Sequence, residues 1–123
     1  MNDHTLVVKE AQVQSVIKNL QGRSIRMDVK TTDLKKKEYD VEMQKADSGA
    51  KPKRARYNSS LMDANAILPG DDTELLPETY VIFIIENDVL RGNLPIYHVE
   101  RMIKENGKLF DDKSYIIYVN GEI

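Results

Sequence analysis

The stretch RMDVKTTDLKKKEYDVEMQ, residues 26–44, carries alternating apolar and polar residues on both sides of a lysine run. Such alternation is typical of β-strands that turn one face toward a core. It predicts one strand over residues 25–32 and a second over residues 38–45, joined across the lysines. The stretch therefore predicts an antiparallel hairpin.

The register of this hairpin follows from its apolar residues. Pairing Met27 with Met43, and Val29 with Val41, puts all four on one face, where they can meet a core. A slip of one residue would turn this set to the other face, so the pattern favours this register or one close to it. The same pairing leaves three polar pairs on the opposite face: Arg26 with Gln44, Asp28 with Glu42, and Lys30 with Asp40.

The pairing of Asp28 with Glu42 needs an explanation, because like charges directly opposite on paired strands destabilise a sheet. One interpretation is a solvent-facing surface on which Lys30–Asp40 and Arg26–Glu42 form ion pairs worth at most about 1 kcal/mol each. The other is a divalent cation held between the two carboxylates, since Mg²⁺ and Mn²⁺ prefer hard oxygen ligands. The pattern leaves both interpretations open.

The rest of the chain predicts an α/β or α+β domain with a mainly mixed sheet and a helix against one face. The segment TYVIFIIE, residues 79–86, is apolar on both faces, as a strand covered from both sides must be. Asn106-Gly107 is a strong hairpin signal. Further strands are expected over residues 5–17, 95–103, 108–110 and 115–119.

One helix is expected over residues 53–68, after Pro52, which suits the first turn of a helix. Its large apolar residues recur at helical spacing, and this pattern predicts that they form the buried side of the helix. The residues of this apolar stripe are Tyr57, Leu61, Ala64 and Leu68.

Composition indicates a single globular domain spanning residues 1–123. The chain has no cysteine, which excludes disulfides and thiolate zinc sites and suits a reducing cytoplasm. Its longest apolar run, residues 80–85, is too short to span a bilayer. Residues 1–57 carry 13 Lys and Arg against 8 Asp and Glu, whereas residues 58–123 carry 5 against 12. The basic half can attract nucleic-acid phosphate, although a solvated surface of mixed charge is the simpler interpretation.

Other polar residues show no catalytic arrangement. His4 and His98 have no partner at ligand or triad spacing, and Ser59 and Ser60 lack the strained turn of a nucleophile. The acidic run at residues 71–74 is most simply a solvated loop.

Several segments together resemble a known family. These are the hairpin at residues 26–44, KRARYNSSLMDA at 53–64, LPETYVIFIIENDVL at 76–90, LPIYHVER at 94–101 and SYIIYVNGE at 114–122. From about Val13 to its end the chain resembles the bacterial PD-(D/E)XK nuclease family transposases, which are related to recombination-promoting nucleases. The resemblance implies a restriction-endonuclease-like core with a central sheet and flanking helices, in a bacterial cytoplasmic protein.

The resemblance also implies an activity, metal-dependent endonucleolytic hydrolysis of DNA phosphodiester bonds during transposition or recombination. Asp28 corresponds to the motif aspartate, and Glu42-Met43-Gln44 to the acidic-x-lysine tripeptide. The two carboxylates and the Met43 backbone carbonyl would bind Mg²⁺ or Mn²⁺. Gln44 would position the attacking water, and Arg54 and Arg56 would hold a DNA phosphate.

The chain departs from the family pattern in three places. Met27 precedes Asp28 where the motif has proline, and Gln44 stands in the lysine position, a substitution common in this family. Gln44 cannot act as a cation or general acid, so its expected role is to orient a water by hydrogen bonding. The helical region that usually precedes the first strand is not recognised, which predicts an N-terminally truncated fragment of a longer family protein.

Two alternatives accompany this assignment. The chain could be a catalytically inactive remnant that binds nucleic acid, or an oligomerisation module. Arg54 and Arg56 could instead cap neighbouring carboxylates or face solvent, and Tyr57 is expected in the core. A homodimer is also expected, because the helix can cover only one face of the strand at residues 79–86, and exposed apolar faces are commonly buried by two-fold pairing.

Overall fold

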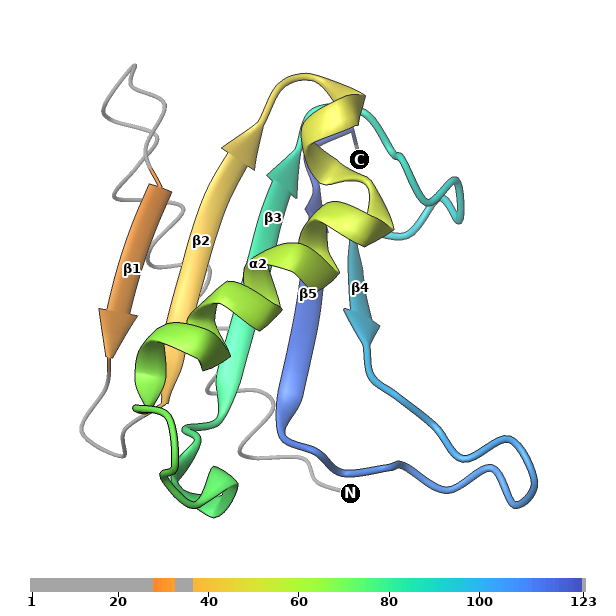
Figure 1. The fold of residues 1–123 in the computed structure, drawn as a ribbon. Coiled ribbons are helices and arrows are strands. Elements are labelled where there is room, and N and C mark those ends of the chain that lie inside the picture. Colours follow the sequence, from red (N-terminus) through yellow and green to blue (C-terminus); the bar gives the residue numbers. More distant parts are fainter. Residues whose placement is uncertain (1–27, 33–36, 123) are drawn as a thin grey trace.

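The computed structural model describes residues 28–32 and 37–122 (Figure 1). They form a mixed five-stranded sheet in the order β1-β2-β3-β5-β4, with helix α2 lying across one face. The strands are β1 (Asp28–Thr32), β2 (Glu38–Gln44), β3 (Thr79–Ile85), β4 (Ile96–Val99) and β5 (Ser114–Asn120). The predicted mixed sheet is confirmed. The strand expected over residues 5–17 lies outside the described residues.

The register of the first hairpin is confirmed. β1 and β2 are antiparallel, and Asp28 lies opposite Glu42, Val29 opposite Val41 and Lys30 opposite Asp40. The pairs expected for Arg26 and Met27 lie outside the described residues. β2, β3 and β5 run parallel to one another, and β4 is antiparallel to β5. The outer described strands, β1 and β4, therefore both run antiparallel to the three central strands.

Helix α2 (Pro52–Ala66) connects the parallel strands β2 and β3, and Pro52 occupies its first turn as predicted. The short 3-10 turn η1 (Asp47–Ala50) precedes it, and η2 (Thr73–Leu75) follows it. Parallel neighbours need a crossover connection of this kind, because a tight turn cannot reverse the chain and return it to the starting edge.

The predicted buried side of α2 is wrong. The side chains of the apolar stripe are exposed, with Tyr57 58% and Leu61 41% accessible. The helix ends at Ala66 rather than at the expected residue 68, so Leu68, 73% accessible, lies beyond it. The buried residues of the helix are instead Ala55, Asn58, Ser59 and Met62. Small residues on this side let the helix backbone lie close to the sheet, where Val81 and Phe83 are fully buried.

Both faces of β3 are buried, as its sequence predicts. On the helix side, Val81, Phe83 and Ile85 pack with Ala55, Met62 and other apolar residues. On the second face, Tyr80 stacks between Tyr39 and Tyr115, with ring centroids 4.9 Å apart in both pairs.

The expectation of an uncovered second face is not met. Tyr80, Ile82 and Ile117 on that face are buried in the single chain. The argument for a homodimer through this face of the sheet therefore loses its premise.

Residues 100–113 form a projecting arm between β4 and β5 (Figure 1). Met102 pairs with Leu109 in an isolated antiparallel bridge, and Gly107 adopts a positive φ of 72° at the turn. The hairpin signal at Asn106-Gly107 is confirmed, although the regular strand β4 already ends at Val99. Among the described residues, no helix combines the length and apolar character needed to cross a bilayer.

Candidate active site

The carboxylate of Glu42 is buried beneath helix α2. Only 6% of Glu42 is accessible, and both of its carboxylate oxygens accept hydrogen bonds. Asn58 of α2 donates from Nδ2 to Oε2 at 2.8 Å, and Gln44 of β2 donates from Nε2 to Oε1 at 2.9 Å. Hydrogen bonds to an ionised carboxylate are strong and offset part of the cost of burying its charge. The two amides thus hold Glu42 in a defined orientation.

The alternation of β2 produces this arrangement. Tyr39, Val41 and Met43 pack on the second face of the sheet, so the residues between them face α2. Asp40, with 2% of its surface accessible, is buried on the same side as Glu42. The interpretation of this polar face as solvent-facing is therefore wrong for Asp40 and Glu42.

Asp28 occupies the register position directly opposite Glu42, on the edge strand β1. Directly opposite residues of antiparallel strands share one face of the sheet. The side chain of Met43 packs on the second face of the sheet, away from Glu42. Its backbone carbonyl is therefore the group that Met43 can offer to a site beside Glu42. The register thus pairs Asp28 with Glu42 as the sequence predicts, and Met43 follows Glu42 along β2. That these residues form a metal site stays a prediction.

This donor set suits a hard divalent cation, which takes carboxylate and carbonyl oxygens. Glu42 is a carboxylate whose orientation is already set by Asn58 and Gln44, and Asp28 is placed opposite it by the register. Within residues 37–122, whose side chains the structure describes, no group of three or more His, Cys, Asp or Glu residues is arranged to hold a metal. Asp28 is the carboxylate that the strand register places opposite Glu42.

Gln44 is packed against Gly49 of η1. A Cβ atom at residue 49 would lie 2.0 Å from Oε1 of Gln44 and 2.8 Å from its Cδ. Only glycine leaves room for the amide that donates to Glu42. Gly49 therefore acts on Glu42 through Gln44.

Gly49→Ala should displace the Gln44 amide and weaken its hydrogen bond to Glu42. The clash falls on the end of a flexible side chain, so the free energy of unfolding, measured with urea, should fall by only about 1 kcal/mol, the usual contribution of one hydrogen bond. A double-mutant cycle with Gln44→Ala checks this, because Gly49→Ala should cost nothing further once Gln44 is truncated. Additive losses would mean that Gly49 acts by another route.

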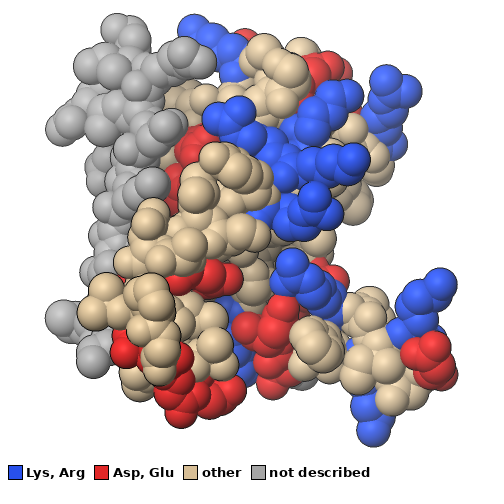
Figure 2. All heavy atoms as spheres, viewed as in Figure 1, with Lys and Arg blue, Asp and Glu red and all other residues tan. Residues whose placement is uncertain are grey.

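Arg54 and Arg56 are exposed on the first two turns of α2. They belong to a basic surface of five exposed residues, Lys45, Lys51, Lys53, Arg54 and Arg56. Figure 2 shows Lys and Arg gathered over the end of the molecule where α2 begins. The structure thus places these arginines on a solvent-facing surface, two turns or less from Asn58, and Tyr57 lies exposed among them rather than in the core.

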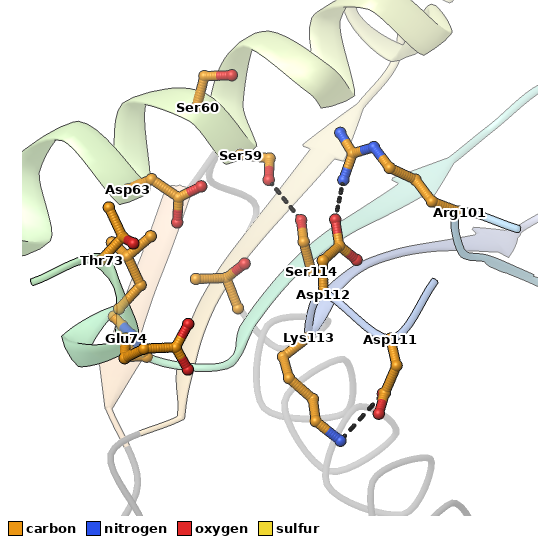
Figure 3. Close-up of a pocket in the computed structure, with 13 residues that line it drawn as sticks. Ser59, Ser60, Asp63, Thr73, Glu74, Arg101, Asp111, Asp112, Lys113 and Ser114 are labelled. Atoms are coloured by element: carbon orange, nitrogen blue, oxygen red, sulfur yellow. Dashed lines mark hydrogen bonds and ion pairs between the residues drawn. The ribbon is translucent and has the colours of Figure 1, made fainter. Parts of the chain in front are cut away.

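A pocket of about 450 Å³ lies at the other end of α2, between the helix, η2 and the segment leading into β5. Figure 3 shows Ser59 and Asp63 pointing from the helix toward this segment. Ser59 and Ser114 share a hydrogen bond of 2.9 Å, and Arg101 donates to Asp112 at 2.7 Å. Burial raises the pKa of Asp63, Arg101 opposes this rise and Asp112 adds to it. The pocket is separate from Glu42 and carries a surplus of carboxylates.

That the other polar residues named from the sequence have no catalytic role stays a prediction. His98 is exposed on β4, and Ser59 is held by Ser114 without a strained turn. Asp71, Asp72 and Glu74 are exposed, as expected for a solvated loop. His4 lies outside the described residues.

Two residues of the site, Asn58 and Gly49, were not predicted from the sequence. Asn58 lies 16 residues from Glu42, and nothing in the helix pattern distinguishes it from other polar residues. Gly49 lies in a segment that appears only as a break between elements. Each became recognisable only through its contact with Glu42 or Gln44.

A mixed sheet with a helix over one face, and a paired aspartate and glutamate on neighbouring strands, is consistent with the α/β fold of restriction-endonuclease-like nucleases. The family model described as PD-(D/E)XK nuclease family transposase matches residues 8–121 of the 123 residues. The chain belongs to this family. No curated protein and no solved structure matches it significantly.

Proposed function

We propose that this domain is a metal-dependent endonuclease that hydrolyses DNA phosphodiester bonds. The observation that carries the proposal is the buried Glu42 carboxylate, oriented through both oxygens by Asn58 and Gln44 and opposed in register by Asp28. Its support from the comparisons is the family membership over residues 8–121. PD-(D/E)XK nucleases generally use divalent metal ions.

Asp28, Glu42 and the Met43 carbonyl would hold Mg²⁺ or Mn²⁺. When bound, such an ion neutralises phosphate charge and lowers the pKa of a coordinated water. Asn58 holds the Glu42 carboxylate in place. Gln44 does the same, and the second hydrogen of its Nε2 can orient the attacking water, so its proposed role is wider than the water-positioning role that the family resemblance implies.

Arg54 and Arg56 would bind the DNA backbone. They are exposed, carry permanent charge, and lie on the helix that supplies Asn58 to the site. Phosphate contacts fix the position of the duplex without reading its sequence.

Plasmid nicking tests the function directly. The wild-type chain should nick supercoiled DNA with Mg²⁺ or Mn²⁺ and not with a chelator. The Asp28→Asn, Glu42→Gln double variant should lose this activity, and its melting temperature should no longer rise with added metal, as ligand linkage requires of the wild type. No nicking despite metal-dependent stabilisation would favour an inactive remnant of the fold, and equal nicking by the double variant would reject the site.

Replacing Arg54 and Arg56 with alanine should weaken DNA binding and flatten its salt dependence. Counterion release changes the slope of log affinity against log salt by roughly 0.9 per phosphate contact. Fluorescence anisotropy with one duplex over a salt series measures both quantities. The control is Lys104→Ala with Lys108→Ala, which removes the same charge from the exposed arm and should leave the slope unchanged. Equal losses in the two pairs would mean a diffuse charge effect.

A further inference from the structure

The apolar stripe of α2 has the spacing of a buried helix face, yet it points to solvent. Tyr57, Leu61 and Ala64 lie on α2 and are exposed, and Leu68, just beyond the end of the helix, is exposed next to them in sequence. Such a stripe on an amphipathic helix normally meets a partner. The opposite side of the helix already packs on the sheet, so the stripe is a second apolar side on one helix.

The charges around the stripe differ between its two ends. The basic surface surrounds the beginning of α2, whereas the exposed Asp71, Asp72 and Glu74 follow its end. In Figure 2, Lys and Arg occupy the end where α2 begins, Asp and Glu occupy the end where it finishes, and uncharged residues lie between them. This surface therefore has the opposite charge at each end and an apolar centre.

A second copy of the same chain is the partner that this distribution fits. A two-fold axis that lies in the plane of the interface, perpendicular to α2 and level with its middle, sets the two helices antiparallel and face to face. It brings the basic beginning of each helix against the acidic end of the other, and each apolar stripe against its counterpart. A 15-residue helix is roughly 22 Å long, enough to keep the two charged ends apart. An acidic or basic partner would complement only one end.

We propose that the chain forms a symmetric dimer through the exposed side of α2, with the apolar stripes at the centre and Lys51 and Lys53 of each copy facing Asp71 and Glu74 of the other. This surface differs from the sheet face considered in the sequence analysis. It does not depend on nuclease activity, and the residues chosen to test it exclude Arg54 and Arg56.

Two charge variants test the pairing. Lys51→Glu with Lys53→Glu makes both ends acidic, and Asp71→Lys with Glu74→Lys makes both ends basic. All four residues are exposed, so each variant should fold, which its cooperative melting confirms. By light scattering without DNA, the wild type should have twice the mass of the monomer, each variant alone should be monomeric, and an equimolar mixture of the two should regain the dimer mass.

An apolar variant provides the second arm of the test. Tyr57→Ser with Leu61→Ser should give a monomer, whereas Leu109→Ser with Phe110→Ser, which removes two apolar residues of similar exposure from the arm, should leave the dimer intact. A wild-type chain that is monomeric at all concentrations, a mixture of charge variants that stays monomeric, or a dimer lost only in the arm variant would each overturn the proposal.

Discussion

Glu42→Gln should abolish metal-dependent nicking while leaving the protein folded. The substitution keeps the shape of the side chain and removes the charge that a divalent cation needs. Replacing groups that merely orient metal ligands costs roughly 10–100-fold in affinity or activity, so loss of a ligand should cost more than about 100-fold. The new amide would meet two amide donors, Asn58 and Gln44, but Asn58 can rotate its amide to present oxygen instead.

The matched control is Glu38→Gln, the same chemical change on the same strand but four residues away. Glu38 is half-buried at the opposite end of β2 and pairs with Thr32 rather than Asp28. It should retain wild-type nicking and wild-type stabilisation by metal. Activity in Glu42→Gln equal to that of this control would show that Glu42 is not a ligand.

Asn58→Asp should destabilise the protein strongly at neutral pH. It places a second carboxylate at the position from which Asn58 now donates at 2.8 Å to Glu42. Two negative charges so close in a partly desolvated site repel by on the order of 3 kcal/mol at an effective dielectric constant near 20. Urea unfolding should therefore show a much lower free energy of unfolding for this variant at pH 7.

The loss should depend on pH. Repulsion raises the folded pKa of the pair above the unfolded values, which are about 3.9 for Asp and 4.3 for Glu. The native state then binds protons more tightly than the unfolded state, so the repulsive part of the loss grows as pH rises above about 4 and disappears below it. Mg²⁺ or Mn²⁺ should recover part of the loss if the site binds metal.

Asn65→Asp is the control for this variant. Asn65 is exposed on the same helix, and the substitution adds the same charge without a carboxylate beside it. It should unfold nearly as the wild type does. A loss in Asn58→Asp no larger than in Asn65→Asp, or one independent of pH, would contradict the contact with Glu42. Asn58→Ala should fall between them, costing about 1–3 kcal/mol for the donor removed from a buried acceptor.

The three Asn58 and Asn65 variants test whether helix α2 holds the Glu42 carboxylate of β2 in place. The β2 strand alone presents Glu42 on a polar face. Asn58 approaches from α2, and Gln44, backed by Gly49, holds the other oxygen. The carboxylate is therefore oriented by residues from two elements before any ligand arrives, which reduces the ordering that binding must impose.

The sequence by itself determined the pairing of Asp28 with Glu42. The alternation of residues 28–32 and 38–44 favours this register or one close to it, because a slip of one residue would turn the apolar residues to the other face. The two-sided burial of β3 and the start of α2 at Pro52 were equally readable, because each depends on local composition. So was the proximity of Met43 and Gln44 to Glu42, which follows from their adjacency in the chain.

Only the tertiary structure decided which side of α2 is buried. The helix carries two stripes at the same spacing, a large apolar one with Tyr57 and Leu61 and a small one with Ala55 and Ser59. Hydrophobicity favours the first, but the helix must lie close enough to the sheet for Asn58 to reach Glu42, and small side chains permit that approach. Helical periodicity in the sequence carries no information about the sheet that the helix will face. Which side of α2 is buried therefore depends on a contact between residues 16 positions apart in the chain.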